Sequence, residues 1–153
     1  MCKQIVPLRQ GLDSWRLGLP AQDFAYPCDV TNLGSGGPNR QLKRFETLLK
    51  GEGIASARTS EGPPNSLAWA KHHPYLLEAL AAGYDASTLD ELIAFIRRAQ
   101  TERRWAILVF HDVGPPDLSK GSISADLHDA LPGVITRDRI PCKRVCDVIA
   151  ALA

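Results

Sequence analysis

One apolar run constrains the fold of this chain more than any other feature. Residues 105–113 read WAILVFHDV, and the five residues 106–110 are apolar without alternation. A strand buried on both faces of a parallel sheet has this pattern, whereas a strand with one solvated face alternates apolar and polar residues. The run ends at His111 and Asp112, before a Gly-Pro-Pro turn. Because ligands of α/β folds bind at the carboxyl ends of parallel strands, His111 is the first candidate for a functional residue.

Helical and extended patterns alternate along the rest of the chain. Apolar residues at helical spacing predict helices over 8–17, 38–50, 87–100, 122–131 and 145–152, and short extended patterns predict strands over 23–27, 54–59 and 140–145. Ser87 and Asp90 are the expected capping pair of the helix over 87–100. Residues 60–85 read as a long loop, and loops of that length in compact domains are usually functional. The order of strands and helices predicts an α/β fold with parallel strands and flanking helices.

Size, charge and cysteine spacing exclude several classes of function. A chain of 153 residues forms one domain, and a net charge of +1 gives no reason to expect a nucleic-acid partner. No apolar run approaches the roughly 18 residues of a membrane-spanning helix, and the start of the sequence lacks the apolar core of a signal peptide, so we expect a cytoplasmic chain without membrane contact. Cys142 and Cys146 match no zinc pattern, and the glycines of 34–37 lack the Lys-Ser/Thr of a phosphate-binding loop.

Five short segments, taken together, resemble a known family. They are Phe24-Ala25-Tyr26-Pro27, Ala57-Arg58-Thr59, Pro74-Tyr75-Leu76, Leu89-Asp90-Glu91-Leu92 and the run 105–113. In order and spacing they resemble the C-terminal half of the polysaccharide deacetylases, the NodB-homology carbohydrate esterases. The resemblance implies a distorted (β/α) barrel that removes acetyl groups from a polysaccharide or oligosaccharide.

The family's metal-binding segments are missing from this sequence. Its members hold a divalent metal, usually zinc, with an aspartate of a TFDDG-like segment and two histidines of an HxxxH segment, both upstream of the region that matches. This chain contains no Asp-Asp pair and no two histidines separated by three residues. We therefore expect residues 1–153 to form a single partial domain, a truncated and inactive copy with neither a metal nor another cofactor of its own.

The resemblance assigns roles to a few matching positions. His111 corresponds to the histidine that donates a proton to the leaving amine, a task that suits the near-neutral pKa of imidazole. Val109 corresponds to a position in the pocket for the acetyl methyl group. Tyr26, Pro27 and Cys28 correspond to the groove wall, with the backbone N–H of Cys28 as the expected oxyanion donor.

Asp112 and two positions of the groove-wall segment match the family less clearly. Asp112 either orients His111 or caps the following turn. In many members of the family an arginine and a glycine stand where this sequence has Ala25 and Asp29. The resemblance therefore covers the groove wall without matching it at every position.

Two alternatives remain open at the level of sequence. In the first, the chain is a non-catalytic carbohydrate-binding or interaction module in which Tyr26, Trp69 and Tyr75 stack on sugar rings, although burial in a core explains these aromatic residues equally well. In the second, the chain is an incomplete barrel whose open sheet edge near residues 24–28 pairs with another copy. Neither reading identifies the sugar.

Overall fold

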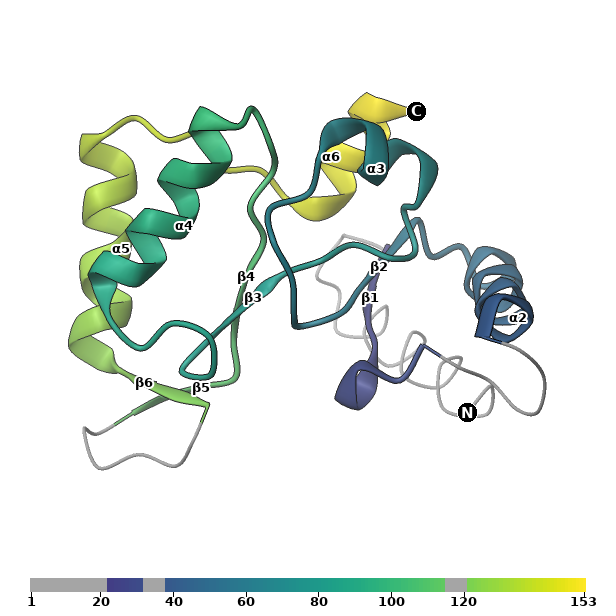
Figure 1. The fold of residues 1–153 in the computed structure, drawn as a ribbon, viewed down its shortest axis with the longest axis horizontal. Helices are drawn as coiled ribbons and strands as arrows, with labels where there is room; N and C mark the ends of the chain where they lie inside the picture. Colours follow the sequence, from purple (N-terminus) through teal and green to yellow (C-terminus); the bar gives the residue numbers. More distant parts are fainter. Residues whose placement is uncertain (1–21, 32–37, 115–120) are drawn as a thin grey trace, which may run out of the picture.

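Short parallel strands run through the middle of the molecule, with helices packed around them (Figure 1). The computed structural model describes residues 22–31, 38–114 and 121–153. Strand β1 (Asp23–Ala25) pairs with β2 (Ser56–Arg58), β3 (Leu80–Ala82) pairs with β4 (Leu108–Phe110), and β5 (Asp112–Gly114) pairs with β6 (Ser122–Ser124). All three pairs are parallel. This is the α/β class that the sequence predicts, and the described residues form no closed barrel.

A single residue links the first two strand pairs. The N–H of Leu77 donates to the carbonyl oxygen of Ala57 over 3.0 Å, and the N–H of Thr59 donates to the carbonyl oxygen of Leu77 over 2.9 Å. Leu77 lies three residues before β3, so the chain leaves its contact with β2 and then pairs with β4. The segment that leads into β3 therefore lies beside β2, so the pair β1–β2 and the pair β3–β4 are adjacent in space.

Within the described residues, five helices and one 3₁₀ turn connect or follow the strands. They are the 3₁₀ turn η1 (Pro27–Asp29) and the helices α2 (Pro38–Gly51), α3 (Leu67–His72), α4 (Leu89–Thr101), α5 (Ala125–Arg137) and α6 (Val145–Leu152). The predictions for α2, α4 and α6 are confirmed, because each has a continuous apolar stripe that one local segment can define. The predicted helix over 8–17 and the glycines of 34–37 lie outside the described residues.

The cap of α4 lies one residue later than predicted. Thr88, not Ser87, is the N-cap, and its hydroxyl accepts from the N–H of Glu91 over 3.3 Å. The Glu91 carboxylate accepts from the N–H of Thr88 over 3.0 Å, which closes a reciprocal capping box. A glutamate at this position reaches back to the cap, so Thr88 and Glu91 replace the predicted pair Ser87 and Asp90.

Three other local predictions are wrong. Residues 60–85 are not one loop, because they contain α3, which the Ser66 hydroxyl caps, and β3, whose Leu-Ala-Ala sequence has no β-branched residue to mark it. Residues 122–124 of the predicted helix over 122–131 form strand β6, and the helix starts at Ala125. The predicted strand over 140–145 is absent, because residues 140–144 are irregular and Val145 begins α6. Strand pairing with distant residues, which local patterns do not report, accounts for β3 and β6.

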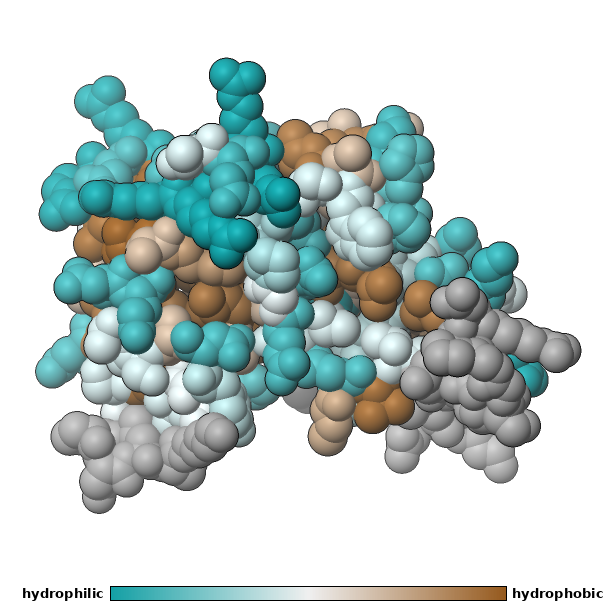
Figure 2. Space-filling model, in the orientation of Figure 1, coloured by the Kyte–Doolittle hydropathy of each residue, from teal (hydrophilic) through white to brown (hydrophobic). Residues whose placement is uncertain are grey.

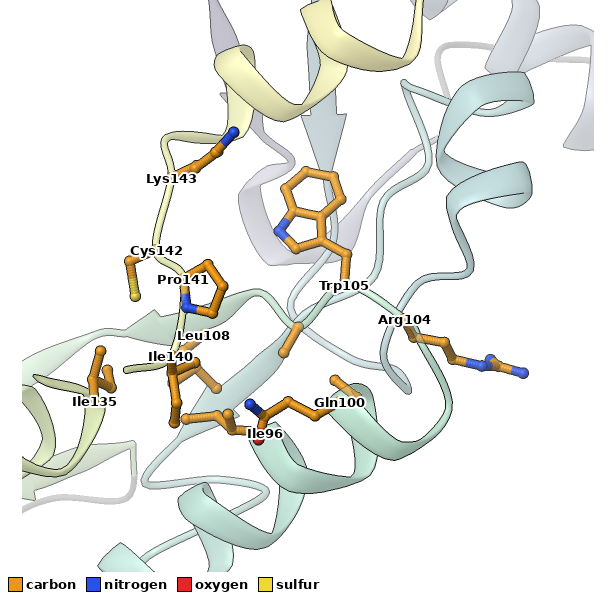
Figure 3. A pocket seen from close by; sticks show the side chains of 12 residues that line it. Ile96, Gln100, Arg104, Trp105, Leu108, Ile135, Ile140, Pro141, Cys142 and Lys143 are labelled. Carbon is orange, nitrogen blue, oxygen red and sulfur yellow. The ribbon is translucent and has the colours of Figure 1, made fainter. Parts of the chain in front are cut away.

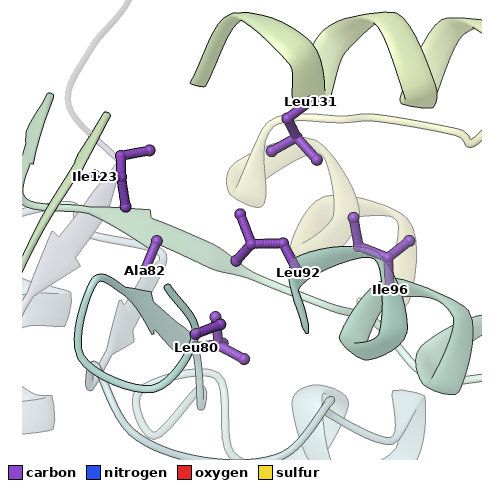
Figure 4. Close-up of a cluster of buried hydrophobic side chains, with 7 residues drawn as sticks. Leu80, Ala82, Leu92, Ile96, Ile123 and Leu131 are labelled. Carbon is purple, nitrogen blue, oxygen red and sulfur yellow. The ribbon is translucent and has the colours of Figure 1, made fainter. Parts of the chain in front are cut away.

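The two faces of β3 and of the segment before it are covered by different helices. Leu80 and Ala82 pack in one cluster with Leu92 of α4 and Leu131 of α5, and these side chains point toward one another in Figure 4. Leu77 and Ala79 belong to a second cluster, against which Ile149 of α6 and its apolar neighbours pack. Successive side chains of a strand point to opposite faces, so the strands are held between α4 and α5 on one side and α6 on the other. A third cluster joins β1 and β2 to α2.

One carboxylate ties the last helix to the first strand. Asp23 Oδ1 accepts from the Ser56 hydroxyl over 2.6 Å, and Asp23 Oδ2 accepts from the N–H of Cys146 over 3.2 Å. Cys146 lies in the first turn of α6, where backbone N–H groups lack partners within the helix. A residue of β1 therefore caps a helix that begins more than a hundred residues later.

The surface combines apolar patches with strongly hydrophilic ones. Figure 2 shows hydrophilic side chains gathered over the end of α4, where Arg98 and Arg104 both pair with Glu102, at 2.8 Å and 2.9 Å. Among the helices that the structure describes, none is long and apolar enough to cross a membrane.

Candidate functional site

A pocket of about 680 Å³ opens where β1, β2 and β4 end. We call it the carboxyl-end pocket. It gathers residues from four separate parts of the sequence, namely Ala25, Tyr26, Pro27, Cys28, Asp29, Arg58, Ser60, Glu61, Ala81, Tyr84, Asp85, Val109, Phe110 and His111. Of the candidate site residues named from the sequence, Tyr26, Pro27, Cys28, Val109 and His111 line this pocket, whereas Asp112, Trp69 and Tyr75 do not.

The wall after β1 is a tight turn with two residues in the left-handed region. Cys28 and Asp29 have φ values of 52° and 55°, which are uncommon for residues other than glycine. The N–H groups of Asp29 and Val30 donate to carbonyl oxygens within the turn, over 3.2 Å and 3.1 Å. The N–H of Cys28 makes no such bond to any described residue, so it is the turn's available donor.

Asp29 fixes this turn to the loop after β2. Its two carboxylate oxygens accept from the N–H and from the hydroxyl of Ser60, over 2.6 Å and 2.5 Å. Both oxygens of Asp29 are therefore engaged inside the protein, and the loops after β1 and β2 form one continuous wall.

The side chain of Tyr26 points away from the pocket into the core. Tyr26 is 4% exposed, and its hydroxyl donates to the carbonyl oxygen of Tyr75 over 2.8 Å. Burial, with smaller contributions from Glu46 and Tyr75, raises the pKa of Tyr26 to about 12. Tyr75 is buried as well, and its hydroxyl donates to the carbonyl oxygen of Ile54 over 2.7 Å. Neither ring is available to stack on a sugar.

Trp69 also lies away from the carboxyl-end pocket. Its indole Nε1–H donates to the carbonyl oxygen of Leu76 over 3.1 Å, and its ring lies 4.0 Å from the His73 ring, centroid to centroid. Trp69 is thus part of the surface of α3, with a partner for its polar atom.

His111 ends β4 at the rim of the pocket, next to an aromatic residue that the sequence analysis missed. The His111 side chain is exposed, and the Tyr84 ring meets it edge to face with centroids 5.4 Å apart. Tyr84 is 51% exposed, although it lines the pocket. A Cβ at Gly121 would lie 2.1 Å from the Tyr84 ring, so a glycine at 121 is what allows the ring this position.

Asp112 does not line the pocket. Its Oδ2 accepts from the Ser122 hydroxyl over 3.2 Å, across the pair of β5 and β6. This contact gives Asp112 a structural role in the strand pair. The extended chain does not stop at His111, because β5 begins at Asp112.

Three charged residues of the pocket, Arg58, Glu61 and Asp85, were not singled out from the sequence as site residues. Asp85 follows β3, and its Oδ2 accepts from the N–H of Ala81 over 2.9 Å. Arg58 ends β2 beside Ala25, its register partner on β1. Burial lowers the pKa of the Arg58 guanidinium, and the Asp29 carboxylate acts in the opposite direction. Arg58 belongs to the segment Ala57-Arg58-Thr59 that resembles the family, but the sequence assigns it no role, because its position next to Ala25 depends on strand pairing.

The described residues do not fit the zinc ion that the resemblance implies. Among the residues that the structure describes, no three His, Cys, Asp or Glu side chains come together in a way that could hold a metal ion. The full sequence contains neither of the family's metal-binding segments.

A second pocket, of about 360 Å³, lies at the amino end of β4 (Figure 3). We call it the amino-end pocket. Trp105 forms one wall. Most of the other lining residues are apolar, namely Ile96, Ala99, Ala106, Leu108, Ile135, Ile140 and Pro141, and the remaining ones are Gln100, Arg104, Cys142 and Lys143. None of the residues predicted to be functional lies there.

Comparison of this chain with protein-family models, with curated proteins and with solved structures finds no match. The resemblance to the deacetylases therefore depends on the sequence segments alone.

Proposed function

We propose that the carboxyl-end pocket binds an acetylated carbohydrate, and that the chain is related to the polysaccharide deacetylases, with its strands forming part of a distorted (β/α) barrel. One observation carries this proposal. The Cys28 turn, Val109 and His111 come from distant parts of the sequence, and the resemblance assigns all of them to one groove; they line a single pocket. The polar rim and apolar floor suit an acetamido group on a sugar ring.

The proposed roles follow from the position of each group. The methyl of the acetyl group packs on Val109, which is 6% exposed, and the carbonyl oxygen accepts from the N–H of Cys28. In a complete site, water would lose a proton to a base as it adds to the carbonyl carbon, the C–N bond would break, and protonated His111 would give its proton to the leaving nitrogen, so that acetate and a free amine result. A metal ion would activate the water in the family. Because the sequence lacks both metal-binding segments, we expect this chain alone not to release acetate.

Binding and turnover are tested separately. Calorimetric titration with N-acetylated chitotriose should show binding by the wild-type chain and at least a tenfold loss for Val109→Trp, which fills the pocket. Leu67→Trp, an exposed position of α3, is the matched control and should bind normally. Equal affinity of Val109→Trp and wild type would place any binding elsewhere. Acetate release with added zinc should be undetectable, and turnover above that of His111→Ala would overturn the expectation of inactivity.

The runner-up function is a non-catalytic carbohydrate-binding module, and Tyr84 favours it. Tyr84 is the exposed aromatic ring of the pocket, and it takes the stacking role that the sequence analysis gave to Tyr26, Trp69 and Tyr75. A module of this kind binds chitotriose and unacetylated cellotriose alike through ring stacking, whereas a deacetylase-type pocket prefers the acetylated sugar. Loss of both affinities in Tyr84→Ala, without preference for the acetyl group, would favour the binding module.

We further propose that the chain self-associates through the outer edge of β1. Within the described residues β1 pairs with β2 alone, and an unpaired strand edge favours pairing with another chain. Sedimentation velocity over a range of concentrations should show a dimer, and a monomer throughout would contradict this proposal.

A further inference from the structure

The guanidinium of Arg58 is a half-buried charge of the carboxyl-end pocket that makes a single hydrogen bond to a described residue. Arg58 is half-buried, and among the described residues its one hydrogen bond is from Nη1 to the carbonyl oxygen of the adjacent Thr59, at 3.3 Å. A guanidinium has five N–H donors, and no ion pair within 4.0 Å is formed with any described carboxylate. Partly buried charges normally have partners, so with one bond among the described residues the Arg58 guanidinium is a candidate for binding a ligand.

The neighbours of Arg58 leave its donors free for a ligand. The Asp29 carboxylate acts on the charge of Arg58, but it accepts hydrogen bonds from Ser60 and forms no ion pair with Arg58 within 4.0 Å. The register partner of Arg58 on β1 is Ala25, whose single methyl group leaves room above the strand pair. Arg58 and His111 therefore line the same space from different strands, with Ala81 of β3 contributing to the floor.

The charges of the pocket decide what kind of acceptor fits. Three carboxylates, those of Asp29, Glu61 and Asp85, line the pocket together with the single guanidinium of Arg58. An anionic sugar would enter against this excess of negative charge, whereas a neutral carbonyl oxygen accepts a charge-assisted hydrogen bond without that penalty.

We propose that Arg58 binds the acetyl carbonyl oxygen of a neutral N-acetylated sugar, and that this contact gives the pocket its preference for acetylated over unacetylated carbohydrate. This inference rests on the proposed function, since it assigns the group that reads the acetyl substituent. Arg58 joins the N–H of Cys28 as a second donor to the same oxygen, and the carboxylates disfavour acidic sugars.

A neutral pair of ligands tests the inference. N-acetylated chitotriose and cellotriose differ at C2, where an acetamido group replaces a hydroxyl. By calorimetry the wild type should prefer the acetylated sugar by about tenfold or more, in line with a charge-assisted hydrogen bond. Arg58→Met keeps an apolar stem and should reduce the preference to about twofold or less, with Arg58→Lys in between. Arg44→Met, at an exposed position of α2, is the control and should behave as wild type.

The outcomes separate this inference from the proposed function. If the wild type binds neither sugar, the proposed function is wrong and the inference falls with it. If the wild type prefers the acetylated sugar and Arg58→Met keeps that preference, the function stands and the role of Arg58 is wrong. Should Arg58→Met fail to fold, the side-chain Nε–H resonance of wild-type Arg58 gives the answer: it should shift on addition of N-acetylated chitotriose, and an unchanged resonance during demonstrated binding refutes the contact.

Discussion

The two pockets share strand β4 but differ in chemistry. Leu108 lines the amino-end pocket, and Val109, the next residue, lines the carboxyl-end pocket. The two pockets lie at opposite ends of this strand: the apolar run supplies Ala106 and Leu108 to the amino-end pocket, and Val109 and Phe110 to the carboxyl-end pocket. The amino-end pocket is bounded by helices and by the irregular segment before α6, and its lining is mainly aliphatic. The carboxyl-end pocket is bounded by the loops that follow the strands, and these loops bring its titratable groups.

The arginines of the two pockets show the same difference. Arg104, at the amino-end pocket, pairs with Glu102 at 2.9 Å and donates to the carbonyl oxygen of Pro64 over 3.2 Å. Arg58, at the carboxyl-end pocket, has a single bond to its own neighbour among the described residues. A satisfied arginine contributes to structure, whereas an unsatisfied one in a pocket is a candidate for ligand binding. The distinction depends on surroundings and not on residue type.

The largest expected effect tests whether both pockets depend on the same core. Leu92 is fully buried between β3 and α5, in the cluster that also holds Ile96 of the amino-end pocket. Leu92→Ala should lower the free energy of unfolding by about 2–5 kcal/mol, measured by urea denaturation. Leu67→Ala, at a position that is 47% exposed, should change it by less than about 0.5 kcal/mol. A loss below about 1 kcal/mol in Leu92→Ala would mean that this cluster does not support the strands.

The next effect concerns the buried tyrosine behind the carboxyl-end pocket. The pKa of Tyr26 rises from 10.0 in a model peptide to about 12 in the folded chain, so the neutral phenol is favoured by folding. The associated stability is complete below pH 10 and is lost as the pH rises toward 12, by about 2–3 kcal/mol in total. Tyr26→Phe should remove most of this alkaline loss in denaturation curves measured across that range. Tyr84→Phe, which changes an exposed ring, should leave it in place, and an identical alkaline loss in both variants contradicts the assignment.

A smaller effect is expected at the tie between β1 and α6. Asp23→Ala removes the acceptor of the Ser56 hydroxyl and of the Cys146 N–H, and should cost about 1–2 kcal/mol of unfolding free energy. Glu52→Ala, a carboxylate with no hydrogen bond or ion pair to another described side chain, is the control and should change stability by less than about 0.5 kcal/mol. Hydrogen exchange should also rise in α6 for Asp23→Ala. If exchange in α6 is unchanged, Asp23 does not hold this helix.

The smallest effect is kinetic and compares the pockets directly. Cys28 lines the carboxyl-end pocket, Cys142 lines the amino-end pocket, and both are exposed free thiols. In chains that keep one of these cysteines and carry serine at the others, N-acetylated chitotriose should slow the reaction of Cys28 with a thiol reagent about threefold or more, as expected for partial occupancy of a binding site. The rate at Cys142 should not change. Protection of Cys142 in place of Cys28 would move the carbohydrate to the amino-end pocket.

Some of the candidate site could be predicted from the sequence, and some could not. His111 is predicted because it ends the apolar run, whereas Val109 and the Cys28 turn are assigned by the resemblance to the deacetylases. The sequence allows Tyr26 and Tyr75 to be either sugar-stacking rings or core residues, and the structure buries both. Tyr84 and Arg58 were missed because nothing in their local sequence distinguishes an aromatic or a cation at a pocket from one on an ordinary surface.

The sequence by itself determined the elements that depend on neighbouring residues. The apolar stripes of α2, α4 and α6 and the run that becomes β4 follow from periodicity, which acts within a turn of helix or a few residues of strand. Only the tertiary structure decided that residues 80–82 form β3, that Asp23 caps α6, and that Arg58, Tyr84 and His111 border one pocket. Those features depend on pairing and packing between residues far apart in the chain, and the energy of such contacts leaves no periodic signal in the local sequence.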